Sequence, residues 1–363
     1  MKRRNAYWRL AIGLLIPACA SGPRPSTVKM EPLVVRSETD PLTGLDAYDA
    51  ADLLQLGNEQ FSAEAYARAV TLFERLVADF PGSEHVPAAL YNGGLAFEKM
   101  GKWGEAARSF SAVVDAHPES SSHKDAFFRL AFSYSKQGRW QDVLRTFRGV
   151  REAYQLGPLE ELETRNGIGV ALFMNEEYAE AESEFRRSIS FYESLSEDQY
   201  VPAEYFVGQS RYYLGEIYAR LFEQRGFTQP LENEDQWVEK IGDELEEKCR
   251  LLLRAQTNLI RAIRVGHGGW ATAAGYRIGS LYETLYDQLL EVPVPASLSD
   301  EARKAYTEEL RKRVAVLIVK AIKVYEMSVE MAERVGEKNE WVQRANASLD
   351  RMKQLYETQL LDG

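Results

Sequence analysis

Apolar and polar positions recur along residues 48–190 with the spacing expected of paired helices. Residues 90–118 show this most clearly: an apolar face with adjacent glycines at Gly93 and Gly94, a turn at Gly101, and a second apolar face that ends at Pro118. Apolar residues three and four positions apart lie on one side of an α-helix, so the stretch predicts a helix, a turn and a second helix. One such pair cannot bury its own apolar face, and neighbouring copies are therefore expected.

The pattern repeats at steps of 37, 37 and 38 residues. Small residues in the first helix let the two helices of a pair approach closely, while aromatic residues fill the space between one repeat and the next. The positions that keep the step include the small residues Gly57, Gly94, Ala131 and Gly169, the turn aromatics Tyr66, Trp103, Trp140 and Tyr178, and the second-helix residues Phe73, Phe110, Phe147 and Phe185. Four regular repeats are predicted over residues 48–190.

After residue 190 the signal loosens but continues. Residues 212–218 and 276–282 resemble the first helix of a repeat, and each is followed by an insertion and then by a second-helix pattern. The second insertion ends at a predicted helix start, Ser299. We predict two elaborated repeats over residues 191–338 and a final amphipathic helix over residues 339–363, which covers the last apolar groove as a cap.

The order of these positions resembles the tetratricopeptide repeat (TPR), with Leu90 in the place of the usual tryptophan. The resemblance covers residues 48–187 well and residues 210–355 loosely. It implies an all-α fold, a right-handed TPR solenoid of about six helix-turn-helix repeats with a C-terminal capping helix. The motif is specific for fold and says little about function.

Composition and charge narrow the partners. The chain has 45% hydrophobic and 27% charged residues, as folded soluble proteins do, and a formal charge of -11. Residues 1–18 hold four cations and no acid, so removing them lowers the charge to -15. An acidic surface repels phosphate backbones, and we predict no nucleic-acid partner.

Residues 1–18 have the pattern of a signal peptide, with a basic start and an apolar run over residues 10–16 that is too short to span a bilayer. Residues 16–19 (IPAC) resemble a bacterial lipobox, which implies that Cys19 becomes the lipidated first residue. Pro17 departs from the usual residue type there. The alternative is an ordinary signal-peptidase site around Ala18 and Ala20, which leaves no anchor.

The lipoprotein resemblance also implies a location. Ala20 after the cysteine suggests delivery to the outer membrane, so we expect a protein anchored by lipid to its periplasmic face, with that lipid as its membrane contact. Residues 19–47 are rich in proline, serine and threonine, and we interpret them as the lipidated cysteine and a flexible tether.

The TPR resemblance places a protein-binding groove on the first helices, because first-helix side chains line the concave surface of such arrays. Exposed aromatic residues there favour a peptide or helical segment as ligand. For each residue the alternative is that it packs beneath the neighbouring repeat. The expected groove residues are Leu54, Asn58, Tyr91, Leu95, Phe128, Phe132, Asn166, Val170, Phe173, Tyr212 and Tyr276.

Catalytic chemistry has little support, and we predict a protein that is not an enzyme and has no cofactor and no metal. No nucleophile elbow, phosphate-binding loop or dinucleotide fingerprint is present in the sequence. The four histidines, His85, His117, His123 and His267, fall in predicted inter-repeat loops and are expected to be solvated. Cys249 lies in a helical pattern, and we expect it to pack in the core.

The signal and the repeats together resemble bacterial outer-membrane TPR lipoproteins, with a layout most similar to that of the gliding-motility (Glt) TPR lipoprotein and a more distant likeness to the TPR lipoprotein of the β-barrel assembly machine. The resemblance implies a non-catalytic envelope scaffold or adaptor that binds a protein segment in its groove, as part of an outer-membrane motility machinery with envelope proteins as partners. The alternatives are a holdase or assembly factor for outer-membrane β-barrel proteins, or a coordinator of peptidoglycan synthesis.

Overall fold

The computed structural model describes residues 34–35, 47–199, 201–231, 234–294 and 299–361. The predicted signal peptide, Cys19 and most of the predicted tether lie outside these ranges. The helices of the described residues are α1 (Ala50–Ser62), α2 (Tyr66–Asp79), α3 (Val86–Lys99), α4 (Trp103–Ala116), α5 (His123–Lys136), α6 (Trp140–Ala153), α7 (Pro158–Met174), α8 (Tyr178–Glu193), α9 (Glu204–Gln224), α10 (Glu234–Val265), α11 (Gly268–Leu290), α12 (Asp300–Val335) and α13 (Glu340–Leu361), with a 3-10 turn at Glu197–Gln199.

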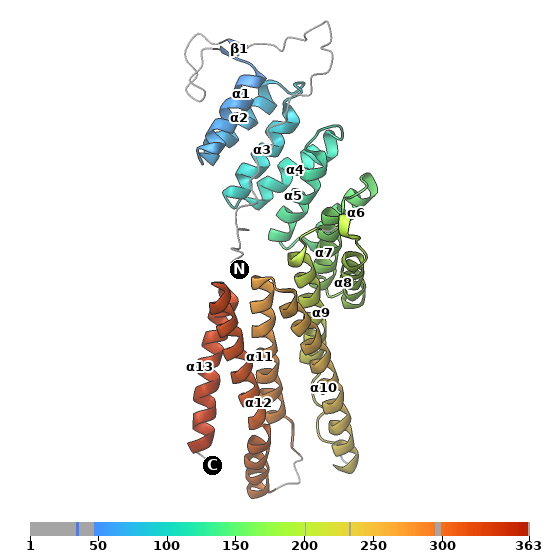
Figure 1. The fold of residues 1–363 in the computed structure, drawn as a ribbon, viewed down its shortest axis with the longest axis vertical. Coiled ribbons are helices and arrows are strands. Elements are labelled where there is room, and N and C mark those ends of the chain that lie inside the picture. Colours follow the sequence, from blue (N-terminus) through green and yellow to red (C-terminus); the bar gives the residue numbers. More distant parts are fainter. Residues whose placement is uncertain (1–33, 36–46, 200, 232–233, 295–298, 362–363) are drawn as a thin grey trace.

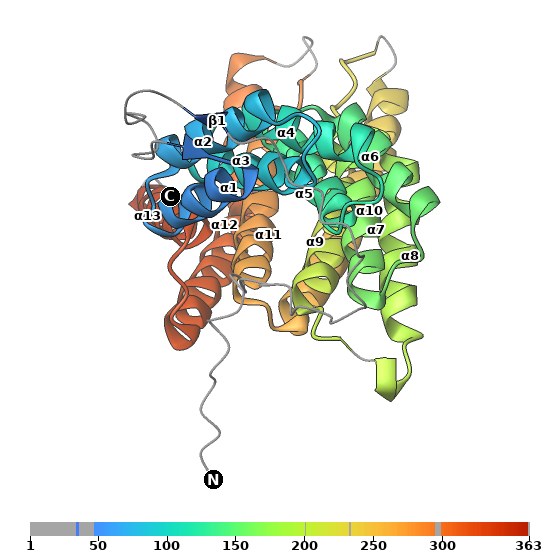
Figure 2. The ribbon, with the colours of Figure 1, turned by 90° about the horizontal axis from the view of Figure 1, so that it is seen from above.

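Consecutive helices pack in pairs, and each pair packs on the next. The described residues form six such pairs, α1/α2 to α11/α12, followed by α13. Seen along the long axis, the chain winds from α1–α3 on the left through α6–α8 on the right and back to α13 on the left (Figure 2). The predicted fold, an all-α solenoid with an end helix, is confirmed.

Small residues fix how closely the two helices of a pair approach. A Cβ built on Gly94 would stand 2.6 Å from the Phe110 ring, so the aromatic ring of α4 lies directly on the glycine of α3. The sixth pair repeats this arrangement, with Gly279 of α11 under the Tyr325 ring at 2.4 Å. The predicted role of the small-residue column holds in regular and elaborated repeats alike.

The last pairs are elongated. Helix α10 has 32 residues and α12 has 36, and both extend along the long axis beyond the regular repeats (Figure 1). Helix α12 begins where the sequence predicts, because the Ser299 side chain accepts a hydrogen bond from the Ala302 backbone N–H at 3.2 Å. Among the described residues, no helix combines the length and hydropathy that a membrane span requires.

Helix α13 covers the end of the apolar core formed by α11 and α12. It buries Ala345, Leu349 and Met352 in that core, as expected of a cap. Two of its exposed charged residues also pair with the preceding helices. Arg351 binds the Glu283 carboxylate, and the Lys353 ammonium lies 2.7 Å from a Glu326 oxygen. The buried apolar residues of α13, rather than these exposed pairs, account for most of its contact with the core.

A short antiparallel ladder stands before α1, within the range predicted as tether. Strand β1 (Val34–Val35) pairs with β2 (Ala47–Tyr48), Val34 opposite Tyr48. Tyr48 is fully buried, and its hydroxyl donates to Asp79 at the end of α2 at 3.0 Å. The ladder therefore joins the solenoid through its second strand.

Candidate functional site

A hollow of about 440 Å³ opens between the first helices of the second, third and fourth repeats. Four of its residues lie on α5 at positions i, i+3, i+4 and i+7, which share one face of a helix. The lining residues are Tyr91 of α3, Asp125, Phe128, Arg129 and Phe132 of α5, and Glu160 and Glu163 of α7. The hollow therefore combines three aromatic rings with charged groups from three successive repeats.

The three rings are held in place by aromatic residues of the second helices. Each makes an edge-on contact that restricts its orientation, and such contacts favour a rigid surface. The pairs are Tyr91 with Phe110 at 5.6 Å between ring centres, Phe128 with Phe147 at 6.1 Å, and Phe132 with Trp103 at 5.7 Å. Phe132 nevertheless exposes 42% of its surface, so the rings present area to a ligand without having to reorganise.

The two cations nearest the hollow already hold carboxylates. The Arg129 guanidinium lies 3.3 Å from Glu98, and the Lys124 ammonium lies 2.5 Å from Glu160. Glu160 also accepts the Gly157 backbone N–H at 2.9 Å. Burial alone would raise the pKa of Glu160, but the Lys124 and Gly157 contacts outweigh it and lower that pKa below 4.5. For Glu98, burial outweighs Arg129 and raises the pKa.

Glu163 differs from these acids. Its half-buried carboxylate has no hydrogen-bonding or ion-pairing partner among the described residues. Burial raises its pKa above 4.5, the Arg129 guanidinium opposes that rise, and the carboxylates of Glu160 and Asp125 add to it. A carboxylate in this situation is stabilised by any cation that enters the hollow.

The predicted groove residues divide among several surroundings. Tyr91, Phe128 and Phe132 meet in the hollow described above. Leu54 and Asn58 line a second hollow on α1, which is larger, at about 610 Å³, but more open to solvent; its other lining residues are Ala51, Gln55, Glu59, Ser62 and His85. Leu95 and Val170 are half-buried and pack against the cores of their own repeats.

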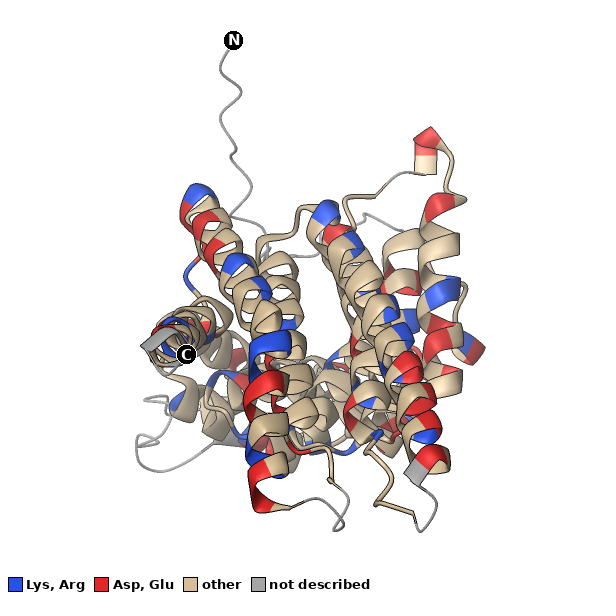
Figure 3. Cartoon of the chain, turned by 90° about the horizontal axis from the view of Figure 1, so that it is seen from below, with Lys and Arg blue, Asp and Glu red and all other residues tan. Residues whose placement is uncertain are grey.

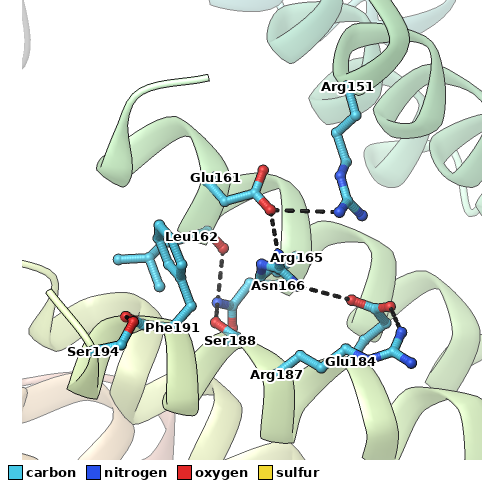
Figure 4. Close-up of polar contacts among 10 residues, drawn as sticks. All are labelled: Arg151, Glu161, Leu162, Arg165, Asn166, Glu184, Arg187, Ser188, Phe191 and Ser194. Carbon is cyan, nitrogen blue, oxygen red and sulfur yellow. Dashed lines mark hydrogen bonds and ion pairs between the residues drawn. The ribbon is translucent and has the colours of Figure 1, made fainter. Parts of the chain in front are cut away.

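Asn166 is a correction to the predicted groove, because it lies in the core with 1% of its surface exposed. Its amide nitrogen donates to the Leu162 carbonyl at 2.9 Å and to the Ser188 hydroxyl at 2.8 Å (Figure 4). The Ser210 hydroxyl in turn donates to the Asn166 amide oxygen at 2.8 Å. The residue thus joins α7, α8 and α9, and it cannot contact a ligand in the groove.

Three aromatic members of the predicted groove pack between repeats. Phe173 and Tyr212 each expose 7% of their surface. Tyr276 is half-buried between second-helix and cap residues. The contacts between ring centres are Phe173 with Tyr178 at 5.5 Å and with Tyr213 at 5.1 Å, Tyr212 with Trp270 at 5.3 Å, and Tyr276 with Tyr325 at 6.0 Å and with Trp341 at 5.7 Å. For these residues the alternative of packing beneath the next repeat describes the structure.

The charged residues of the hollow were missed from sequence. Asp125 and Arg129 follow from Phe128 by helical spacing, a signal that the sequence does contain. Glu163 lies three residues before Asn166, as Asp125 lies three residues before Phe128, so the same spacing leads to it. Helix α7 begins three residues earlier relative to this position than α5 does, and the added turn contributes Glu160.

His123 also departs from expectation. It is buried at the start of α5, with 6% of its surface exposed, and is not solvated in a loop. Its two ring nitrogens contact the Tyr154 hydroxyl at 2.6 Å and the Val114 carbonyl oxygen at 3.0 Å. The ring therefore joins α4, α5 and the residue that follows α6, which is a structural role. Cys249, expected in the core, is a free, half-buried cysteine on α10.

The long helices of the C-terminal half also carry many charges (Figure 3). Acidic residues gather in the first half of α10, where residues 234–247 hold seven acids and Lys240, and acidic and basic residues mix along α12. Such mixing is typical of a solvated helix face, and the exposed ion pairs on it, such as Arg313 with Glu309 at 2.7 Å, contribute little stability. The hollow between α3, α5 and α7 is the better candidate for a binding site.

The fold and the hollow define a helical-repeat protein, a class that binds other proteins through its first-helix surface. Residues 54–121 and 91–142 match the family model described as the tetratricopeptide repeat. Residues 54–142 therefore carry tetratricopeptide repeats. No curated protein matches the chain.

Several solved structures are similar to the chain at low identity and with TM-scores below 0.5. A tetratricopeptide repeat protein from Parabacteroides merdae ATCC 43184 is 13% identical, over 84% of this chain and 98% of its own, with a TM-score of 0.41. YrrB, described as a TPR protein with an unusual peptide-binding site, is 17% identical over 58% of this chain and 86% of its own, with a TM-score of 0.38. MamA from Desulfovibrio magneticus RS-1 is 15% identical over 56% and 97%, with a TM-score of 0.37. Likenesses at these scores say nothing about function.

Proposed function

We propose that this protein is a non-catalytic adaptor that binds a segment of another protein in the hollow between α3, α5 and α7. One observation carries the proposal: three rigid, partly exposed rings from two repeats meet there beside carboxylates from a third. Rigid aromatic groups give contact area at a low cost in conformational entropy, which is why they concentrate at protein-binding surfaces. A peptide or helical segment fits a hollow that several parallel elements share.

The setting is a further part of the proposal. We propose that the chain is exported, that Cys19 is lipidated, and that the folded body lies at the periplasmic face of the outer membrane as part of a motility machinery. The support comes from the signal-like residues 1–18 and the layout of the repeats. A Cys19→Ala variant should move from the membrane to the soluble fraction. A variant that stays in the membrane fraction would show that lipid at Cys19 does not anchor it.

The adaptor role is tested by a pull-down from cross-linked cells with a Tyr91→Ala, Phe128→Ala, Phe132→Ala variant. Loss of one defined partner is expected. The control is Tyr306→Ala, because Tyr306 is exposed at 40% on α12, away from the hollow. Circular dichroism and thermal unfolding test whether both variants fold. If the triple variant does not fold, the single variant Phe132→Ala replaces it in the pull-down.

Other outcomes of the pull-down separate the rival functions. Loss of protection for many unfolded β-barrel proteins, with no single partner lost, would favour a holdase. Loss of peptidoglycan synthases would favour coordination of wall synthesis. Unchanged binding in the triple variant would remove the hollow as the site.

A further inference from the structure

Two carboxylates of the hollow are without partners. Asp125 and Glu163 form no hydrogen bond or ion pair within the described part of the chain. The neighbouring acids differ, since Glu160 holds Lys124 and Glu98 holds Arg129. Lys124 and Arg129 are therefore engaged, and the Asp125 and Glu163 carboxylates are left for a ligand.

The charges that line the hollow sum to a net negative value. Asp125, Glu160 and Glu163 supply three carboxylates and Arg129 one guanidinium, which leaves two negative charges. Adding the ion-pair partners Glu98 and Lys124 leaves that balance unchanged, because they are one acid and one base. Low-dielectric walls concentrate such a field and raise the local concentration of cations.

The rings of the hollow suit a cation as well. An ammonium group is attracted to the face of an aromatic ring within about 6 Å of its centre. The Lys136 ammonium already lies 5.1 Å from the Phe132 ring centre, which shows that this wall accepts one. Lys136 offsets one of the two negative charges. Within the described part of the chain, no lysine or arginine lies over the Tyr91 or the Phe128 ring.

We propose that the hollow receives a lysine or arginine side chain from the bound segment, with its alkyl stem on Tyr91 and Phe128 and its charge between Glu163 and Asp125. The inference rests on the proposed function and specifies the chemistry of the occupant. Long basic side chains are suited to such a place, because their stems bury against apolar surface while the charged head pairs at the end. An acidic segment would enter a field of its own sign.

The test is selection of a random twelve-residue peptide library on the full chain, followed by calorimetric titration of the enriched peptides. We expect lysine or arginine at one fixed position. Glu163→Gln should weaken the best peptide about tenfold, since a charge-assisted hydrogen bond is lost. The matched control is Glu239→Gln, which makes the same change of net charge on the exposed face of α10. When the fixed basic residue of the peptide is replaced by glutamine, the unmodified chain and Glu163→Gln should bind the peptide with equal affinity.

The outcomes separate this inference from the proposed function. Some results would support the hollow as a binding site but contradict the cationic occupant. These are peptides that need Tyr91 and Phe128 but carry no basic residue, and peptides that bind Glu163→Gln as tightly as the unmodified chain. Acidic peptides would overturn it in the same way. Peptides whose affinity is unchanged by Tyr91→Ala and Phe128→Ala, or a selection that enriches no peptide, would contradict both the proposed function and the cationic occupant.

Discussion

At the scale of single residues, the close contact between a first-helix glycine and a second-helix ring explains why both types recur. The Gly94→Ala change places a methyl group 2.6 Å from the Phe110 ring. Overpacking costs about 1–3 kcal/mol, while the better helix propensity of alanine returns about 1 kcal/mol. We expect a net loss of stability, measured as a lower midpoint of urea unfolding.

Gly104→Ala is the matched control for that change. Gly104 also lies in a helix, but the nearest atom to an added Cβ is the side-chain oxygen of Gln137 at 3.9 Å. This variant should gain about 0.5–1 kcal/mol from propensity alone. Equal effects of the two substitutions would mean that the contact with Phe110 does not set the helix distance.

Glu163 gives a pH-dependent prediction. Burial raises its folded-state pKa above 4.5, with Glu160 and Asp125 adding to the rise and Arg129 opposing it, and Tyr205 of α9 faces the same group. Because the folded state holds this proton more tightly than the unfolded state, ionisation destabilises the fold at neutral pH, and that destabilisation disappears as the pH falls through the folded-state pKa to below 4.5.

Glu163→Gln should therefore unfold at a higher urea concentration than the unmodified chain at pH 7, with no difference at about pH 4. Glu239→Gln should show no difference at either pH, since Glu239 is exposed. If Glu163→Gln gained more resistance to urea at pH 4 than at pH 7, the Glu163 pKa would not be raised in the folded state.

At the scale of elements, the elaborated repeats depend on buried ion pairs as well as on apolar contacts. The Arg277 guanidinium of α11 lies 2.6 Å from Glu216 and 2.7 Å from Glu223, both on α9. The Arg277 and Glu216 side chains expose 13% and 7% of their surface, so water cannot replace the lost partner. The pairs hold α11 against α9 in a fixed register.

Arg277→Met is expected to cost about 3–5 kcal/mol, because it leaves the Glu216 carboxylate buried and unpaired. Thermal unfolding followed by circular dichroism measures the effect. Adding Glu216→Gln should recover part of the loss. Arg313→Met is the control, with its pair 77% and 58% exposed, and should change the unfolding temperature far less than Arg277→Met. Similar losses in Arg277→Met and Arg313→Met would show that the buried pair is not special.

Helices α5 and α7 show how far the sequence predicts the binding hollow. Helical spacing from Phe128 would have found Asp125 and Arg129, and the aromatic pattern did find Tyr91, Phe128 and Phe132. The predicted place of Asn166 was wrong because its amide bonds to Ser188 of α8 and Ser210 of α9, partners that repeat periodicity does not reveal.

At the scale of the whole molecule, a solenoid is stabilised by contacts between neighbouring repeats. A substitution that destabilises one end should therefore leave the repeats at the other end stable. Leu349 of α13 is buried in the core shared with α11 and α12. Leu349→Ala should cost about 2–5 kcal/mol through the lost contacts and the cavity. Hydrogen exchange should then accelerate in α11–α13 and remain unchanged in α1–α6.

Gln343→Ala, an exposed change on the same helix, is the control and should leave exchange unaltered in every helix. Uniform acceleration across α1–α13 in Leu349→Ala would indicate that the chain unfolds as one cooperative unit. The C-terminal core is formed by residues of α9 to α13 and includes none from α1–α6, which favours acceleration confined to the C-terminal helices.

The sequence by itself determined the paired helices, their step and the end helix, because small residues, rings and helix-ending signals act within one repeat. The start of α12 at Ser299 was predictable for the same reason. Only the tertiary structure decided which aromatic residues line a hollow and which pack between repeats, since that depends on helix lengths and on the angle between neighbours. It also placed Glu163 and Asp125 beside the Tyr91 and Phe128 rings, a juxtaposition of residues from three repeats that no local pattern encodes.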